Sequence, residues 1–187
     1  LVVLLGIPAL FALAPPSRGA STLGTAGDFA VLAGTTFTNT GLTIVNGGSV
    51  GVSPGTAITG FLPGKVTAPF TLQSAGPITL QAQNDLTSAY NQAAGLAPTT
   101  DLTGQDLGGM TLTPGVYHFS SSAQLTGTLT LNSLGDPDAQ FIFQIGSTLT
   151  TASNSSVVEI NTGAQPGCDV FWQIGSSATL GTGTNFE

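Results

Sequence analysis

The sequence predicts a mostly β domain of the solenoid class, with one long α-helix packed along its side. Three observations predict it: short β-type runs separated by Gly, Pro and Asn, an internal echo of one motif, and a single segment with helical periodicity. Short strands with frequent glycine corners suit either a sandwich or a solenoid. The echo favours the solenoid, because self-similarity at a fixed offset is typical of stacked coils.

The β-type runs are rich in β-branched and aromatic residues, which favour strands. Their spacing is short and irregular. The runs are Phe29–Ala33, Thr43–Val45, Ser49–Val52, Thr111–Thr113, Val116–Phe119, Leu125–Leu131, Phe141–Ile145, Val157–Ile160 and Val170–Ile174.

The echo joins two five-residue motifs. Phe143-Gln144-Ile145-Gly146-Ser147 returns 29 positions later as Trp172-Gln173-Ile174-Gly175-Ser176, and each copy leads into a Thr-rich stretch. Strict hexapeptide periodicity is absent, so we expect an irregular solenoid.

One segment, residues 79–94, breaks the β pattern. Its apolar residues recur at helical spacing on one face, and Gln, Asp and Ser cover the other face. Gly95 stands where a helix C-cap belongs, and Pro98 prevents the helix from resuming. We therefore expect a helix over about 79–94 that covers a wall of the solenoid. The apolar positions are Ala82, Leu86, Ala89, Tyr90 and Ala93.

The composition excludes several classes of partner. Charged residues make up 6% of the chain, against about 25% in an average globular protein. Arg18 and Lys65 are the only basic residues. Binding to nucleic acid or to an anionic membrane needs a cluster of Lys or Arg side chains, so the composition excludes both partners. The hydrophobic content of 41% excludes a disordered polar tract.

The first 20 residues read as a secretion signal that lacks its own start. Residues 1–14 form an apolar run too short to span a bilayer, and small residues and prolines follow it. A core helix is the alternative interpretation of this run. We expect residues 1–20 to be the signal, residues 21–187 to be the mature domain, and the protein to be secreted.

Chemistry-bearing residues are few and scattered. His118 lies in a strand pattern and reads as a half-exposed side chain, and Cys168 reads as a small buried residue. The residue types of Asp136-Pro137-Asp138 are typical of a turn, and we interpret this segment as a turn rather than as a calcium site. A polysaccharide lyase needs Arg or Lys to stabilise developing negative charge, and the predicted mature chain has only Lys65. We expect no enzyme activity, no metal and no organic cofactor.

Threonine is the residue type that the chain uses instead of charge. Quartets of the form Thr-Gly/Ala-X-Thr/Asn begin at positions 40, 56, 151 and 182, and Thr also alternates along predicted strands. Strand and turn propensity explains part of this use, but not the exclusion of charge. The candidate surface residues are Thr40, Thr43, Thr56, Thr59, Thr128, Thr148, Thr151, Asn154, Thr182 and Asn185.

A flat rank of threonines is a rigid grid of methyls and hydroxyls. The Thr χ1 is stiff, same-face residues repeat about every 6.6–6.8 Å along a strand, and stacked coils are about 4.7–4.9 Å apart. Such a grid holds water in an ordered, bridging arrangement, which charged groups would disturb. These are the properties of a surface that binds ice, with an affinity drawn from area and rigidity.

Several long motifs resemble the large microbial ice-binding (antifreeze) protein family with the discontinuous β-solenoid fold. The resemblance covers Leu23 to the end of the chain. The motifs are residues 23–32 (LGTAGDFAVL), 51–60 (GVSPGTAITG), 81–90 (QAQNDLTSAY), 107–117 (LGGMTLTPGVY), 141–145 (FIFQI) and 171–175 (FWQIG).

The resemblance implies a right-handed, triangular solenoid with one helix alongside and a flat ice-binding face rich in Thr, Ser, Ala and Asn. It implies an ice crystal surface as the partner of a monomer. Members usually continue for some tens of residues past the equivalent of Phe186, so we expect this chain to lack its last coils. The alternative function is a non-catalytic extracellular adhesion or matrix module that uses the same solenoid as a surface or spacer.

Overall fold

The structure is a computed structural model of the whole chain. It describes residues 23–39, 44–62, 64–163 and 169–185, together with the backbone of residues 9–13.

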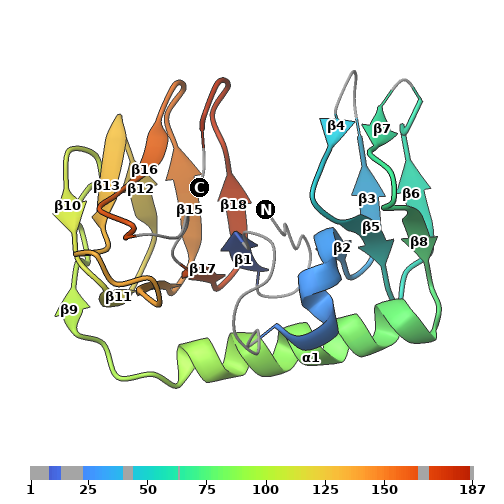
Figure 1. Cartoon of the computed structure of the whole chain (residues 1–187), viewed down its shortest axis with the longest axis horizontal. Helices are drawn as coiled ribbons and strands as arrows, with labels where there is room; N and C mark the ends of the chain where they lie inside the picture. The colour runs from blue at the N-terminus through green and yellow to red at the C-terminus, as the bar shows by residue number, and fades with distance from the viewer. Residues whose placement is uncertain (1–8, 14–22, 40–43, 63, 164–168, 186–187) are drawn as a thin grey trace.

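Two stacks of short β-coils stand side by side along one helix, α1 (Pro77–Ala94) (Figure 1). The strands of the N-terminal stack are β2 (Phe29–Ala33), β3 (Thr36–Thr38), β4 (Ile44–Val45), β5 (Ser49–Val52), β6 (Ala57–Thr59), β7 (Lys65–Val66) and β8 (Leu72–Ser74). The strands of the C-terminal stack are β9 (Thr100–Asp101), β10 (Thr111–Leu112), β11 (Gly115–Phe119), β12 (Ala123–Leu125), β13 (Thr128–Asn132), β14 (Gln140–Ile145), β15 (Thr148–Thr151), β16 (Ser156–Ile160), β17 (Asp169–Ile174) and β18 (Ser177–Thr179).

Each stack has three sides, and each side is a parallel sheet. The first side is β2-β5-β8 in one stack and β9-β11-β14-β17 in the other; the second is β3-β6 and β12-β15-β18; the third is β4-β7 and β10-β13-β16. The chain visits the sides in the same order in both stacks, and both stacks advance in the same direction along α1 (Figure 1). Corresponding sides of the two stacks therefore face the same way, and the predicted β-solenoid with one helix is confirmed.

Strand β1 (Ala9–Leu13) pairs antiparallel with β17, and so extends the first side of the C-terminal stack by one strand. These residues belong to the predicted secretion signal, and the alternative of a core helix does not hold for them. That the segment is removed on export stays a prediction.

The core of the C-terminal stack contains a column of aromatic rings. Tyr117, Phe143 and Trp172 are register neighbours on β11, β14 and β17. The ring centroids of Phe143 and Trp172 are 4.0 Å apart at 10°, and those of Tyr117 and Phe143 are 5.4 Å apart at 23°. All three side chains are buried, so the echo found in the sequence is the repeat of this column.

Helix α1 begins two residues before the predicted start and ends where the sequence predicted. Thr79 closes its first turn, since its hydroxyl accepts from the Gly76 N–H and donates to the Gly76 carbonyl, both at 3.0 Å. Its buried residues are Thr79, Ala82, Leu86, Ala89 and Ala93, and Tyr90 is half-buried against the core. None of the described helices is long and apolar enough to cross a membrane.

The glutamines of the echo lie on the helix side of the sheet. The buried Gln144 amide donates to the carbonyls of Ala93 and Leu96 at the end of α1, at 2.7 and 2.9 Å, and the Ala93 carbonyl also accepts from the Leu96 N–H at 3.4 Å. Gln144 therefore joins the C-terminal end of the helix to strand β14.

The 3-10 helix η1 (Gly24–Asp28) is tied to α1 by a carboxylate. Asp85 Oδ2 accepts from the Thr25 N–H at 2.8 Å and from the Thr25 hydroxyl at 2.7 Å. Gly24 has a φ of +52°, and a Cβ added there would lie 2.6 Å from the same carboxylate oxygen, so the close approach requires glycine.

Candidate functional site

The structure does not gather the predicted threonines on one surface. Thr59 and Thr148 lie on β6 and β15, both on the second side of the solenoid, and Thr56 is exposed just before β6. Thr40 and Thr43 lie outside the described residues. Only part of the predicted set therefore belongs to a common face.

Thr151 is a wrong prediction, because its side chain is turned inward. It is only 3% exposed, its hydroxyl lies 2.9 Å from that of Thr184, and it accepts from the Gly181 N–H at 2.9 Å. Side chains alternate along a strand, so the last residue of β15 points to the same side as the buried Leu149. The buried Thr151 hydroxyl therefore stabilises a turn from the core side and is not exposed to solvent.

The remaining predicted residues lie at the corner between the second and third sides or beyond it. Asn154 and Thr182 are exposed corner residues, and Asn154 adopts a φ of 61° stacked beside Gly183 at 73°. Thr128 lies on β13, on the third side, and Asn185 bridges Ser156 on that same side. The quartets at positions 151 and 182 are therefore turn motifs, as their composition also allowed.

The second side presents a surface of small polar side chains. On four of its strands an apolar residue, such as Phe37 or Leu149, points toward the core between two outward residues; on β12 Ala123 and Leu125 are buried, and Ser122 and Gln124 point outward. We call these outward residues the hydroxyl face. They are Thr36, Thr38, Ala57, Thr59, Ser122, Gln124, Thr148, Thr150, Ser177 and Thr179.

Neighbouring coils hold each other's hydroxyls in place on this face. The Thr148 hydroxyl donates to the Ser122 hydroxyl at 2.8 Å, and the Thr59 hydroxyl donates to that of Thr38 at 3.3 Å. With a stiff Thr χ1, these bonds fix the positions of the oxygens, so the face is rigid.

Charge is absent from the hydroxyl face and present on the other two sides. Asp101, His118 and Asp169 lie on the first side, where His118 Nδ1 and Asp101 Oδ1 are 3.9 Å apart. Lys65 and Glu159 lie on the third side. His118 is half-exposed on its strand, as the sequence predicted.

Asp106 is the only charged residue that borders the hydroxyl face among the described residues. It forms an isolated bridge with Gln124, and its Oδ1 accepts from the N–H groups of Gly108 and Thr126 at 2.7 and 2.9 Å. Desolvation raises the Asp106 pKa, but the donors of Thr126 and Gly108 outweigh it and leave the pKa below its ordinary value. The carboxylate thus stays ionised while it closes the outer corner of the face.

Sequence reasoning missed most of the hydroxyl face. A usable signal exists: each of three strands on this side follows a glycine by two residues and reads polar, apolar, polar. The examples are Thr36-Phe37-Thr38, Thr148-Leu149-Thr150 and Ser177-Ala178-Thr179. The missed residues are Thr36, Thr38, Ala57, Ser122, Gln124, Thr150, Ser177 and Thr179.

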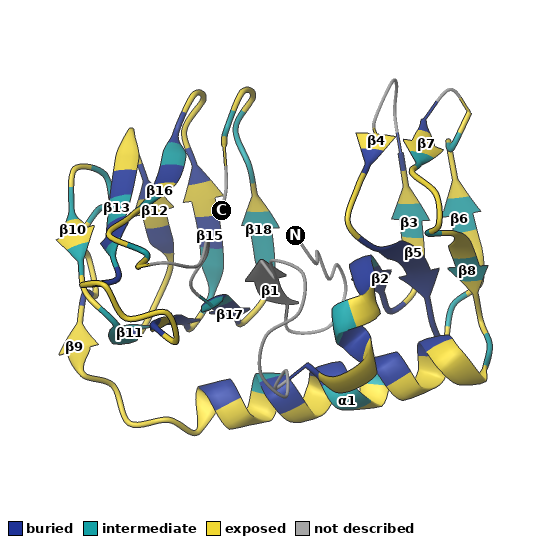
Figure 2. Cartoon of the chain, viewed as in Figure 1, coloured by how far each residue is buried: buried dark blue, intermediate teal, exposed yellow. Residues whose placement is uncertain are grey.

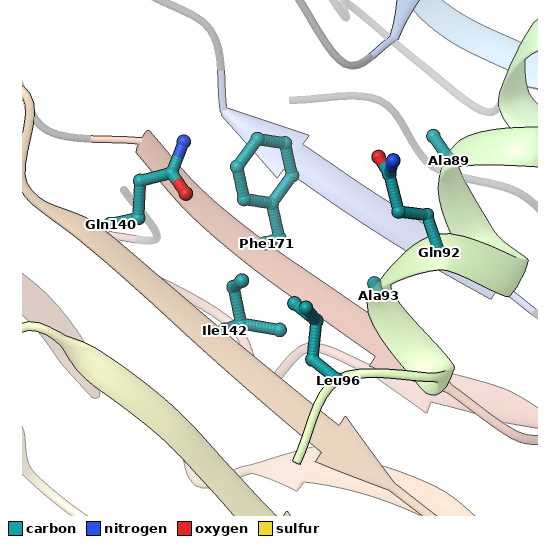
Figure 3. A pocket seen from close by; sticks show the side chains of 7 residues that line it. All are labelled: Ala89, Gln92, Ala93, Leu96, Gln140, Ile142 and Phe171. Atoms are coloured by element: carbon teal, nitrogen blue, oxygen red, sulfur yellow. The ribbon is translucent and has the colours of Figure 1, made fainter. Parts of the chain in front are cut away.

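A cavity of about 280 Å³ lies between α1 and the outer surface of β14 and β17 (Figure 3). Its walls are apolar apart from two glutamine amides, and no titratable side chain lines it, so it carries no catalytic chemistry. Within the described residues, no three His, Cys, Asp or Glu side chains gather at a distance that could hold a metal ion. The lining residues are Ala89, Gln92, Ala93, Leu96, Gln140, Ile142 and Phe171.

Comparison with known proteins points to one family. The profile of the family described as "Ice-binding-like" matches residues 31–187. An ice-binding protein from Nostoc sp. (strain HG1) is 56% identical over 186 residues, which cover 98% of this chain and 67% of the relative. An ice-binding protein from Colwellia sp. is 36% identical over 178 residues, covering 88% of this chain and 68% of the relative.

Solved structures agree with the sequence comparison. The crystal structure of an ice-binding protein from an Antarctic biological consortium superimposes with a TM-score of 0.81 at 41% identity, covering 94% of this chain and 78% of that one. The ice-binding protein of the Antarctic ascomycete Antarctomyces psychrotrophicus gives a TM-score of 0.80 at 38% identity, covering 87% and 77%. Sequence profile, relatives and fold together show that the chain belongs to the ice-binding-like family.

Proposed function

We propose that this protein binds ice and adsorbs to ice crystals through the hydroxyl face. The observation that carries the proposal is that this side of the solenoid presents aligned and mostly hydroxyl side chains, none of them charged, with Asp106 only at their border. The names of the relatives and of the solved structures support the same function. Adsorbed molecules would lower the freezing point below the melting point and slow the recrystallisation of ice.

The geometry of the face suits an ordered layer of water. Outward residues on one strand are about 6.6–6.8 Å apart, and those on stacked coils about 4.7–4.9 Å apart, so the Thr and Ser side chains stand on a two-dimensional grid. Waters that bridge such fixed groups bind nearly as well as direct hydrogen bonds. The first side has charges and a helix against it, and the third side has Lys65 and Glu159; each interrupts such a layer.

Ice binding in this form needs no catalytic group. Each hydroxyl contributes little, and the affinity comes from many contacts made without loss of side-chain freedom. We therefore propose a non-catalytic, cofactor-free monomer that acts outside the cell. The apolar run in residues 1–14, followed by small residues, supports export.

The test is a bulky substitution on the middle strand of the hydroxyl face in the C-terminal stack. Thr150 is exposed and lies between Gln124 and Thr179 in register. In Thr150→Tyr the ring lifts the face from a planar lattice, so we expect thermal hysteresis to fall to roughly half or less, because affinity depends on the whole contact area. The melting temperature should stay nearly unchanged, since an exposed substitution usually alters stability by about 0.5 kcal/mol or less.

The matched control is Thr111→Tyr, the same change at an exposed strand residue on the third side. We expect this variant to keep full hysteresis and full partitioning into ice. Full activity in Thr150→Tyr together with lost activity in Thr111→Tyr would place the ice-binding surface on the third side and refute the assignment.

A further inference from the structure

We infer that Gln124 sets the outer boundary of the ice-binding surface and limits its area. The inference rests on the proposed function and concerns one position of the hydroxyl face. It follows from the register of the strands, from the chemistry of the Gln124 side chain, and from the fact that this side chain does not stabilise the fold.

The register places Gln124 in a rank of threonines. Gln124, Thr150 and Thr179 are successive neighbours on β12, β15 and β18, and Asp106 bridges Gln124 on the outer side. Along this rank the chemistry changes from carboxylate to amide and then to two threonines. In the C-terminal stack the uniform part of the hydroxyl face therefore begins at β15 and continues to β18.

A glutamine interrupts the grid for two reasons. Its side chain extends farther from the strand than that of Thr150, so it rises above the plane that the shorter side chains define. It also rotates about three bonds, whereas the β-branched Thr has a stiff χ1, and ordering a rotamer-rich side chain at an interface costs affinity. No hydrogen bond among the described residues holds the Gln124 amide, whereas Thr148 is bonded to Ser122.

The fold does not require glutamine at this position. The side chain is exposed, and its neighbours Ala123 and Leu125 supply the buried contacts of β12. The hydrogen bond that joins this residue to the preceding coil runs from the Leu107 N–H to the Gln124 backbone carbonyl at 2.9 Å. A threonine keeps this bond and favours the strand, so the substitution extends the rank without disturbing the coil.

The experiment compares Gln124→Thr with the parent chain at equal concentration. We expect thermal hysteresis and the fraction taken into ice to rise by roughly two-fold, the effect of releasing one rotamer-rich side chain from the interface, at an unchanged melting temperature. Gln124→Ala, which removes the obstruction but adds no hydroxyl, should give a smaller gain. Gln140→Thr makes the same change at an exposed strand residue of the first side and should leave activity unchanged.

An unchanged or reduced activity in Gln124→Thr, with its melting temperature retained, overturns the inference. If Thr150→Tyr abolishes activity in the same assay, the proposed function stands and only the boundary is misassigned. If Thr150→Tyr also leaves activity intact, the hydroxyl face itself is misassigned.

Discussion

Residues of one type have opposite roles on the same strand of this protein. Thr148 and Thr150 point outward from β15, while Thr151 is buried beneath the corner that follows. The quartet motif predicted Thr151 as a surface residue, and strand alternation, applied to Leu149 and Thr151 together, would have predicted the opposite. The exposed Thr150 was missed for the same reason.

Thr151 therefore supports a prediction about stability. Thr151→Val keeps the shape of the side chain but removes the hydroxyl that accepts from the Gly181 N–H and contacts the Thr184 hydroxyl. A buried donor left without a partner costs about 1–3 kcal/mol, so we expect a clear fall in the midpoint of urea unfolding.

The exposed neighbour provides the comparison. Thr150→Val changes the same atoms on the solvent side, where about 0.5 kcal/mol or less is typical. Equal unfolding midpoints for the two variants would show that the Thr151 hydroxyl bonds contribute nothing to the fold.

The elements of the fold differ in how visible they are in the sequence. Helix α1 could be predicted from its periodicity and from Gly95, and strands β2 and β5 from their apolar, β-branched runs. The short strands β4 and β10 lie within predicted runs, but others, such as β6 and β8, could not be predicted, because their neighbours in adjacent coils define them. The predicted run Leu125–Leu131 is two strands, since Gly127 turns the corner with a φ of 90°.

The junction of helix and sheet gives a second prediction. Gln144→Met retains the length of the side chain but removes the donor to the Leu96 carbonyl and the 2.7 Å hydrogen bond to the Ala93 carbonyl. We expect destabilisation of about 1–3 kcal/mol, with amide hydrogen exchange accelerated in the last turn of α1 more than in β14.

The exposed Gln92 on the same helix allows a control, because Gln92→Met removes an amide that bonds to no described residue. Exchange in the last turn that is equally slow in Gln144→Met and in the parent chain would contradict the assigned role.

At the scale of the whole molecule, the sequence predicted the solenoid but not the position of the face that we propose binds ice. The echo and the corner glycines indicate stacked coils. Which outward residues become lateral neighbours depends on the register between coils, and residues such as Thr38 and Thr59, or Gln124 and Thr150, are brought together only by that register. For this reason the sequence predicted ice binding, but it did not predict most residues of the hydroxyl face.

The tie between η1 and α1 predicts how stability depends on pH. The Thr25 hydroxyl, the Thr25 N–H and the Gln81 amide hold the pKa of Asp85 below its ordinary value of 3.8. A carboxyl whose pKa is lowered in the folded state contributes its full stability above the unfolded value and loses it as the pH falls through the folded value. We expect the melting temperature to fall below about pH 4.

Asp85→Asn tests the assignment, since it removes the titrating group. The variant should melt lower than the parent at neutral pH, and its melting temperature should fall less on acidification. Parallel acid curves for the two proteins would show that Asp85 does not contribute to this dependence, which would then be due to other carboxyls.

The position of α1 beneath both stacks has a consequence for the periodicity of the surface (Figure 2). Its 18 residues measure about 27 Å at 1.5 Å per residue, whereas the coils repeat every 4.7–4.9 Å or so. The helix packs against both stacks and so fixes the distance between two separate sets of regularly spaced strands. One set is β3 and β6, and the other is β12, β15 and β18. If one stack moved along the helix by a fraction of the coil spacing, the spacing within each set would be unchanged, but the two sets would no longer share one regular repeat. A single plane of an ice crystal would then match the spacing of one set or of the other, but not of both at once.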